Sequence, residues 1–210
     1  MDLNALLIFV IACLAINLIP GPDVIYIVSN TMKGKMTTGL KAAMGLGVGY
    51  FAHTLAACLG LSAIILSSAL AFTLVKVLGA AYLCYLGIKS LYAVWRGESQ
   101  VVLNDKSRAS DNVFLQGIIV SVLNPKVALF FLSFLPQFID TSSADVALQL
   151  LLLGCVFSLL ATACNLLYAV LGSWLFKRAN SARFTRVLDG ISGVLLVGLA
   201  SKVLVSDATK

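Results

Sequence analysis

The chain has 210 residues, of which 60% are hydrophobic and only 11% are charged, and its mean hydropathy is +1.00. A soluble domain carries roughly 25% charged residues, so this composition excludes an ordinary water-soluble protein. The formal net charge is +6. Nucleic acid is not expected as a partner, because the basic residues form no stripe with interleaved aromatic side chains.

Six apolar stretches are each long enough for a membrane-spanning helix, which takes about 20 residues in a hydrocarbon layer of ~30 Å. They cover residues 4–29, 42–66, 71–93, 113–138, 146–174 and 187–205. We expect an all-α membrane protein with six transmembrane helices in a single domain, 1–210, formed by residues 1–95, a polar linker at 96–112 and residues 113–210. The first stretch is not expected to be a signal peptide, because no Lys or Arg precedes it.

All four prolines of the chain fall inside two of these stretches. The first stretch contains Pro20, Gly21 and Pro22, and the fourth contains Pro125 and Pro136. Proline removes a backbone donor and frees a carbonyl, and inside a membrane such groups need a neighbouring helix, a polar side chain or a water-filled cavity. We therefore predict that proline interrupts the first and fourth helices, and that the two breaks belong to a transport pathway.

The two halves of the chain repeat each other. Lys76-Val77-Leu78 opens the third stretch and Arg186-Val187-Leu188 opens the sixth, while the spacing from Phe9 to Pro20 recurs from Phe114 to Pro125. Three spans per half is an odd number, so the second half would enter the membrane upside down. Two inverted three-helix repeats with interrupted first helices are typical of a secondary transporter with its site near the midplane.

Positive charge alternates along the connections. Basic residues gather after the first, third and fifth stretches, at Lys33, Lys35, Lys41, Lys89, Arg96, Lys106, Arg108, Lys177, Arg178, Arg183 and Arg186. The positive-inside rule then places both termini outside the cytoplasm. Anionic lipid headgroups are the expected partners of the basic connections.

Several motifs together resemble the LysE translocator family, the lysine, homoserine and threonine exporters of bacterial inner membranes. They are Pro20-Gly21-Pro22-Asp23, Gly39 through Gly45 and Gly49 followed by His53, the run from Gly79 to Gly87, and Asn124-Pro125-Lys126 with Phe130-Phe131. The likeness extends over nearly the whole chain. It implies export of an amino acid or a derivative across the inner membrane, driven by the proton-motive force; in an inner membrane, the side that the positive-inside rule gives to both termini is the periplasm. It does not name the amino acid.

Two charged residues lie beside the breaks, and each has two interpretations. Asp23 can bind a substrate ammonium or carry the coupled proton; alternatively it caps the half-helix that starts after Pro22. Lys126 lies too deep to reach the interface, so it holds a substrate carboxylate or pairs with Asp23 as an internal counter-ion. Asp23 is the only acid expected well inside the membrane and away from the basic loops, and His53 is the only imidazole expected there.

The amides and the histidine are also open to two interpretations. Asn17 and Asn124 can contact the amino and carboxyl groups of a zwitterion, or bond the carbonyls that Pro20 and Pro125 free. Asn165 in the fifth stretch is similar, with an interhelical hydrogen bond as the alternative. His53 is a candidate proton relay, or else a neutral, hydrogen-bonded core residue.

Other functions have less support from the residues. A passive small-solute channel is the main alternative, because the sequence does not show whether the pathway ever opens to both sides of the membrane at once. A thiol–disulfide electron conduit would need a reactive cysteine beside each break, and the fourth stretch has none. No catalytic constellation indicates an enzyme, and one histidine without acids at ligand spacing indicates no metal site and no cofactor. The expected partners are a small zwitterionic amino acid, protons and lipids, with a homodimer left open.

Overall fold

The computed structural model describes residues 3–61, 63, 68–97, 112–140, 145–175, 186–187, 189–191, 193–198 and 201. In these ranges the regular structure is entirely helical and no strand occurs, as predicted. The elements are α1 (Leu3–Leu18), α2 (Pro22–Ala56), the π-helix η1 (Ala57–Leu61), α4 (Ala69–Arg96), α5 (Val113–Val122), α6 (Pro125–Ser133), the 3-10 helix η2 (Leu135–Phe138) and α7 (Val146–Leu175). A further apolar helix covers Asp189–Gly198.

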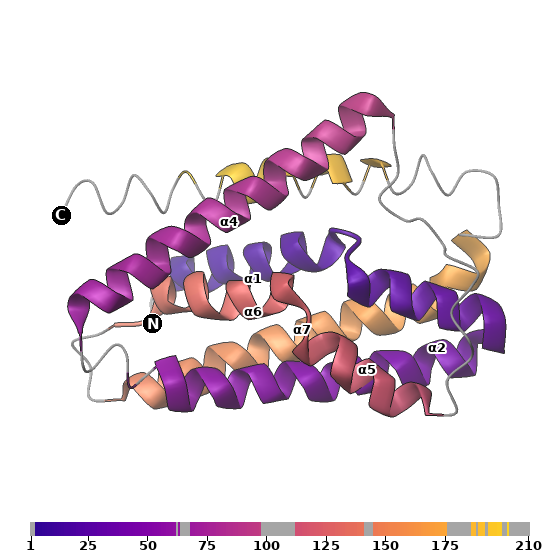
Figure 1. Cartoon of the computed structure of the whole chain (residues 1–210), viewed down its shortest axis with the longest axis horizontal. Coiled ribbons are helices and arrows are strands. Elements are labelled where there is room, and N and C mark those ends of the chain that lie inside the picture. The colour runs from indigo at the N-terminus through magenta and orange to yellow at the C-terminus, as the bar shows by residue number, and fades with distance from the viewer. Residues whose placement is uncertain are drawn as a thin grey trace.

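The helices lie side by side in a bundle. Figure 1 shows α4 along one side of it, α2, α5 and α7 along the opposite side, and α1 and α6 between them. α2 packs against both α5 and α7, and α6 packs against α4. The core at the centre is rich in aromatic rings, including those of Phe9, Phe130 and Phe157, whose side chains are at most 1% exposed.

Two described helices are long and apolar enough to cross a membrane, Gly34–Leu61 and Val146–Leu171. Two bent pairs pass the same test when each is counted as one span, Asn4–Leu18 with Pro22–Met32 and Val113–Val122 with Pro125–Phe138. The expected third span coincides with the helix α4. The expected sixth span, 187–205, is described only in parts, and most of the linker 96–112 lies outside the described residues. Six spans therefore remain a prediction.

The connection between the first two expected spans differs from the sequence interpretation. Instead of a longer basic loop near Lys33, two helical segments within α2 meet at a kink of two non-helical residues. Gly34 has φ −121° and ψ 16°, and Lys35 has φ 72° and ψ 173°, so neither adopts helical angles. A positive φ is unfavourable for a side chain such as that of Lys35, and here it reverses the chain within two residues.

Glycines allow α5 to pack directly on α2. A Cβ atom at Gly45 would clash with the Phe114 carbonyl, and one at Gly49 would clash with Ser121. Gly117 faces the same contact from α5, where an added Cβ would lie 2.8 Å from the Ala42 carbonyl oxygen. Gly45 and Gly49, one turn apart on α2, are thus explained by close helix packing, as expected for apolar helices in a membrane.

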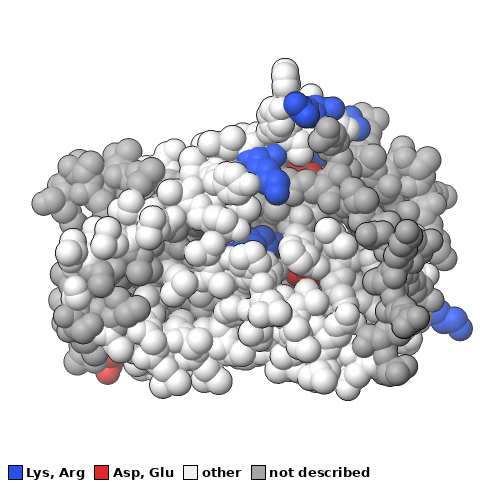
Figure 2. All heavy atoms as spheres, in the orientation of Figure 1, with Lys and Arg blue, Asp and Glu red and all other residues white. Residues whose placement is uncertain are grey.

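The outer surface is largely uncharged. Figure 2 shows a face on which most described atoms belong to residues other than Lys, Arg, Asp and Glu. Large apolar side chains lie on the surface of several helices, for example Leu59 (79% exposed), Leu70 (72%) and Leu159 (63%). So much exposed apolar surface indicates a lipid environment rather than water.

Candidate functional site

The first break separates α1 from α2. α1 ends at Leu18, α2 begins at Pro22, and the two helices are bent by 53°. The carbonyls at the end of α1 are bonded by side chains from distant elements: the Tyr168 hydroxyl of α7 donates to Leu18 O (3.2 Å), and Lys126 Nζ of α6 donates to Ile19 O (3.1 Å). The chain can break here because α6 and α7 supply the missing donors.

The second break separates α5 from α6, with a bend of 47° between Val122 and Pro125. Pro125 has no N–H for the carbonyl four residues earlier, that of Ser121. This carbonyl lies 3.1 Å from His53 Nε2 and also accepts from the backbone N–H of Asn124. Because a carbonyl can only accept, His53 carries a proton on Nε2 in this arrangement. His53 on α2 therefore helps to stabilise the break in the other half of the chain.

A buried ion pair joins the two breaks. Lys126 Nζ lies 3.1 Å from Asp23 Oδ2 and 3.2 Å from Asp23 Oδ1. Asp23 is 0% exposed and Lys126 is 5% exposed. Asp23 is in the first turn of α2 and Lys126 is in the first turn of α6, each directly after a proline. Each charge therefore has its counter-ion within the protein, and neither is left unpaired in a medium of low dielectric constant.

Polar side chains from α2 and α7 extend this pair. The Tyr50 hydroxyl donates to Asp23 Oδ2 (3.4 Å) and accepts from Asn165 Nδ2 (2.8 Å). Asn165 Oδ1 is buried without a partner among the described residues, and so is Asn124 Nδ2 at the second break. Unpaired buried donors and acceptors cost free energy, about 1–3 kcal/mol each, and they are the groups that a polar ligand would satisfy.

The two asparagines that precede the prolines do not bond the carbonyls that the prolines free. Asn17 Nδ2 donates instead to Cys13 O within its own helix (2.7 Å). Asn124 is the N-cap of α6, with its Oδ1 accepting from Lys126 N (3.1 Å). Asp23 does not act as the N-cap of α2, because that position is occupied by Gly21, which has no capping side chain. The carboxylate of Asp23 is turned to Lys126 and Tyr50.

The structure adds residues that the sequence interpretation missed. Neither Tyr50 nor Tyr168 was a candidate site residue, although both are buried and contact the site. Asp189, at 0% exposure, is a second buried acid, and neither of its oxygens has a hydrogen-bond partner among the described residues. Asp189 is the third residue of the expected span 187–205 and follows Arg186 closely, so the sequence suggested a position at the end of that span.

Aromatic rings close the space beside the ion pair. Phe130 stacks on Phe157 at 4.7 Å between ring centroids, and Phe157 also contacts the rings of Tyr50 and Phe131. Phe131 in turn stacks on His53 at 5.7 Å. Within the described ranges no group of His, Cys, Asp or Glu is arranged to hold a metal ion. The described chemistry of the site is thus one buried ion pair, several neutral polar groups and an aromatic wall.

Comparison with known proteins places these features in a family. The family model described as LysE type translocator matches residues 14–207. A Bacillus subtilis (strain 168) protein named "Uncharacterized membrane protein YrhP" is 32% identical, with 95% of this chain and 98% of that protein covered. The "Leucine efflux protein" of Salmonella typhimurium (strain LT2) and that of Salmonella typhi are each 28% identical. In both cases 93% of this chain and 92% of the relative are covered. No solved structure matches. The chain belongs to the LysE translocator family.

Proposed function

We propose that this protein exports a neutral, zwitterionic amino acid across the bacterial inner membrane by proton-coupled alternating access. The observation that carries the proposal is the buried Asp23–Lys126 ion pair, which lies between two broken helices. The relatives named leucine efflux proteins support an amino acid as the substrate. Ionisable residues at such depth in a membrane are expensive and generally mark a route for substrate or protons.

Substrate binding would exchange one ion pair for two. The substrate ammonium would take the place of Lys126 beside Asp23, and the substrate carboxylate would take the place of Asp23 beside Lys126. The unpartnered Asn165 Oδ1 and Asn124 Nδ2 would complete the amino and carboxyl contacts, with Asn17 beside the first break. A zwitterion brings both charges, so every charge stays paired; a substrate with net charge would leave one buried charge uncompensated, at a cost of several kcal/mol.

The same carboxylate offers a means of coupling. A proton and the substrate ammonium would compete for Asp23, because each neutralises it. A proton arriving from the periplasm would then displace the substrate outward, and its release to the cytoplasm would prepare the site for the next substrate. Competition of two ligands for one site, which faces the two sides in turn, gives antiport.

In this proposal residues 1–210 act as one six-helix unit of two inverted repeats with periplasmic termini. α1 with the start of α2 corresponds to α5 with α6, and Asp23 corresponds to Lys126. The support is the matching order of each break: a helix, a turn, a proline at the first helical position and a charged residue directly after it.

Flux through purified protein in liposomes tests the proposal. Wild-type vesicles loaded with unlabelled amino acid should take up labelled leucine or alanine by counterflow, and should do so much less for lysine and glutamate. An imposed pH gradient should drive accumulation, and the rate should saturate with substrate. Non-saturable flux that ignores the pH gradient would favour the passive channel. Empty liposomes and Asp23→Asn with Lys126→Met are the controls.

A further inference from the structure

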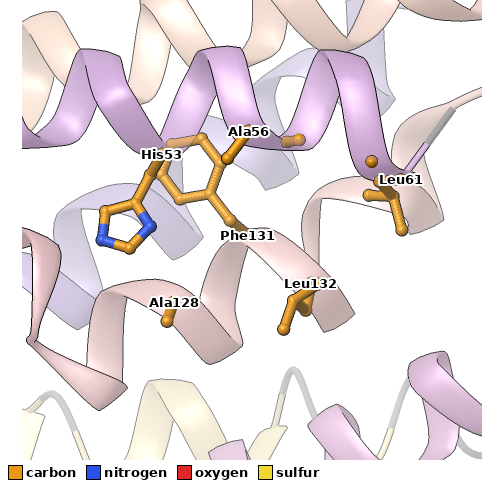
Figure 3. Close-up of a pocket in the computed structure, with 8 residues that line it drawn as sticks. His53, Ala56, Leu61, Ala128, Phe131 and Leu132 are labelled. Atoms are coloured by element: carbon orange, nitrogen blue, oxygen red, sulfur yellow. The ribbon is translucent and has the colours of Figure 1, made fainter.

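A cavity of about 230 Å³ lies between α2 with η1 and α6. Figure 3 shows His53, Ala56 and Leu61 on one side of it and Ala128, Phe131 and Leu132 on the other, with the imidazole of His53 in the space between the two helices. At ~30 Å³ for each water in the liquid, this volume equals about eight waters. It is smaller than the ~300–1,000 Å³ of a site for a drug-sized molecule.

The bend at the second break creates this cavity. α5 packs tightly on the glycines of α2 up to Ser121, beside Gly49. The chain then turns by 47° at Pro125, so that α6 diverges from the second half of α2. His53 lies where the divergence begins, because it contacts both Ser121 O and the ring of Phe131.

Small residues keep the cavity, a wedge between α2 with η1 and α6, open. Ala56 and Gly60 line it from one side and Ala128 lines it from the other. A Cβ atom at Gly60 would meet no described atom within 4 Å, so the space beside this exposed residue is open. η1, the π-helix over Ala57–Leu61, widens the turn at the same place, and single π-helical turns often occur at functional sites.

The cavity has one polar end. His53 is its one polar lining residue, and the other seven are Ala, Gly, Leu or Phe. Two buried polar atoms without a partner, Ser121 Oγ and Asn124 Nδ2, belong to the break that His53 contacts. An apolar pocket with a few polar groups at one end is the arrangement of a small-molecule site, and it matches an amino acid, whose polar and apolar ends are opposite.

We infer that this wedge is the side-chain pocket of the transported amino acid, and that it selects apolar aliphatic side chains up to the size of leucine. This inference rests on the proposed function. A charged side chain would find no counter-ion among the lining residues, so it would be excluded by desolvation. Ala56, Gly60 and Ala128 set the length of side chain that fits, because each would shorten the pocket if enlarged.

Two alanines on α2 give a matched test. Ala56 lines the pocket, whereas Ala52, one turn earlier and also exposed, does not. Counterflow in liposomes is measured for labelled leucine and labelled alanine with wild type, Ala56→Leu, Ala128→Leu and Ala52→Leu. The two pocket variants should lose at least about tenfold in leucine flux while keeping alanine flux within about twofold. Ala52→Leu should transport both amino acids as the wild type does.

A binding measurement separates the pocket from the rest of the cycle. Leucine should raise the Tm of detergent-purified wild type and Ala52→Leu, and it should have no effect on Ala56→Leu, whereas alanine should stabilise all three. If Ala128→Leu does not fold, Gly60→Val takes its place.

Equal losses for leucine and alanine would overturn the inference, and so would unchanged leucine flux in both pocket variants; either result would be expected if a lipid chain occupies the wedge. If wild type transports neither amino acid, the proposed function fails instead.

Discussion

Asp23 and Lys126 occupy the same position in two half-helices, and their charged groups lie 3.1 Å apart. Each is the second residue of its helix, directly after Pro22 or Pro125. A carboxylate is favoured at the positive end of a helix, whereas an ammonium is not. Lys126 is therefore held by Asp23 and by Ile19 O against the field of its own helix, and an anionic group of a ligand would find a favourable position there.

The ion pair predicts a specific pattern of stability. Asp23→Asn should lower the yield of folded protein and the Tm, since an unpaired buried ammonium costs about 3–5 kcal/mol. Asp23→Asn with Lys126→Met should recover part of that loss, because no charge is then left without a partner. Thermal unfolding in detergent measures both. Losses that simply add in the double variant would show that the two side chains do not interact.

Asp189 supplies the matched control for Asp23. Both acids are 0% exposed, but Asp189 has no hydrogen-bond partner among the described residues, so Asp189→Asn removes no described hydrogen bond and should lower the Tm less than Asp23→Asn does. If Asp23 carries the proton, Asp23→Asn, whose side-chain oxygen can still accept from the substrate ammonium, should exchange substrate by counterflow in liposomes but fail to accumulate it under a pH gradient. Asp189→Asn should accumulate it. Accumulation by Asp23→Asn would remove Asp23 from the proton pathway; failure of Asp189→Asn alone would assign the proton to Asp189.

His53 should tolerate a replacement that keeps its hydrogen bond. The amide of His53→Gln can donate to Ser121 O, whereas His53→Leu leaves that carbonyl with only its backbone donor. We expect His53→Gln to keep most of the coupled transport and His53→Leu to lose about 0.5–1.5 kcal/mol of stability. Tm and gradient-driven flux are measured together. Loss of coupling in His53→Gln at an unchanged Tm would instead favour a proton relay.

The hydroxyl of Tyr168 should stabilise the first break. Tyr168→Phe removes the side-chain donor to Leu18 O in this part-buried contact, which should lower the stability by about 0.5–1.5 kcal/mol. Tyr85→Phe is the control, because that side chain is 57% exposed. Equal Tm changes in the two variants would mean that the hydrogen bond contributes nothing.

Topology is testable without transport. The charge asymmetry predicts that both termini lie in the periplasm and residues 98–110 in the cytoplasm. Reporter fusions after Lys210 and within 98–110 should therefore report opposite sides of the membrane. A cytoplasmic C-terminus would contradict the assignment and the count of six spans.

The sequence alone determined the membrane environment and the helical fold, and it predicted breaks at the two proline-containing segments. These follow from local chemistry: long apolar runs form helices in lipid, and Pro20, Pro22 and Pro125 lack the donor that a continuous helix needs. It also limited Lys126 to two roles, because an ammonium at that depth must have a partner. The bend at Gly34–Lys35 was not visible, since a positive φ at a lysine has no sequence signature.

Only the tertiary structure decided which groups meet. Asp23 and Lys126 are 103 positions apart in the chain, and Tyr50 and Asn165 are 115 apart, so their contacts depend on how the helices pack. The structure also showed that His53 and Tyr168 bond carbonyls at the breaks, that Asp189 is buried without a hydrogen-bond partner in the described ranges, and that α6 diverges from α2 to open the wedge. A sequence gives each group's chemistry, but packing selects the partner, because buried polar groups bond whichever donor or acceptor the neighbouring helix presents.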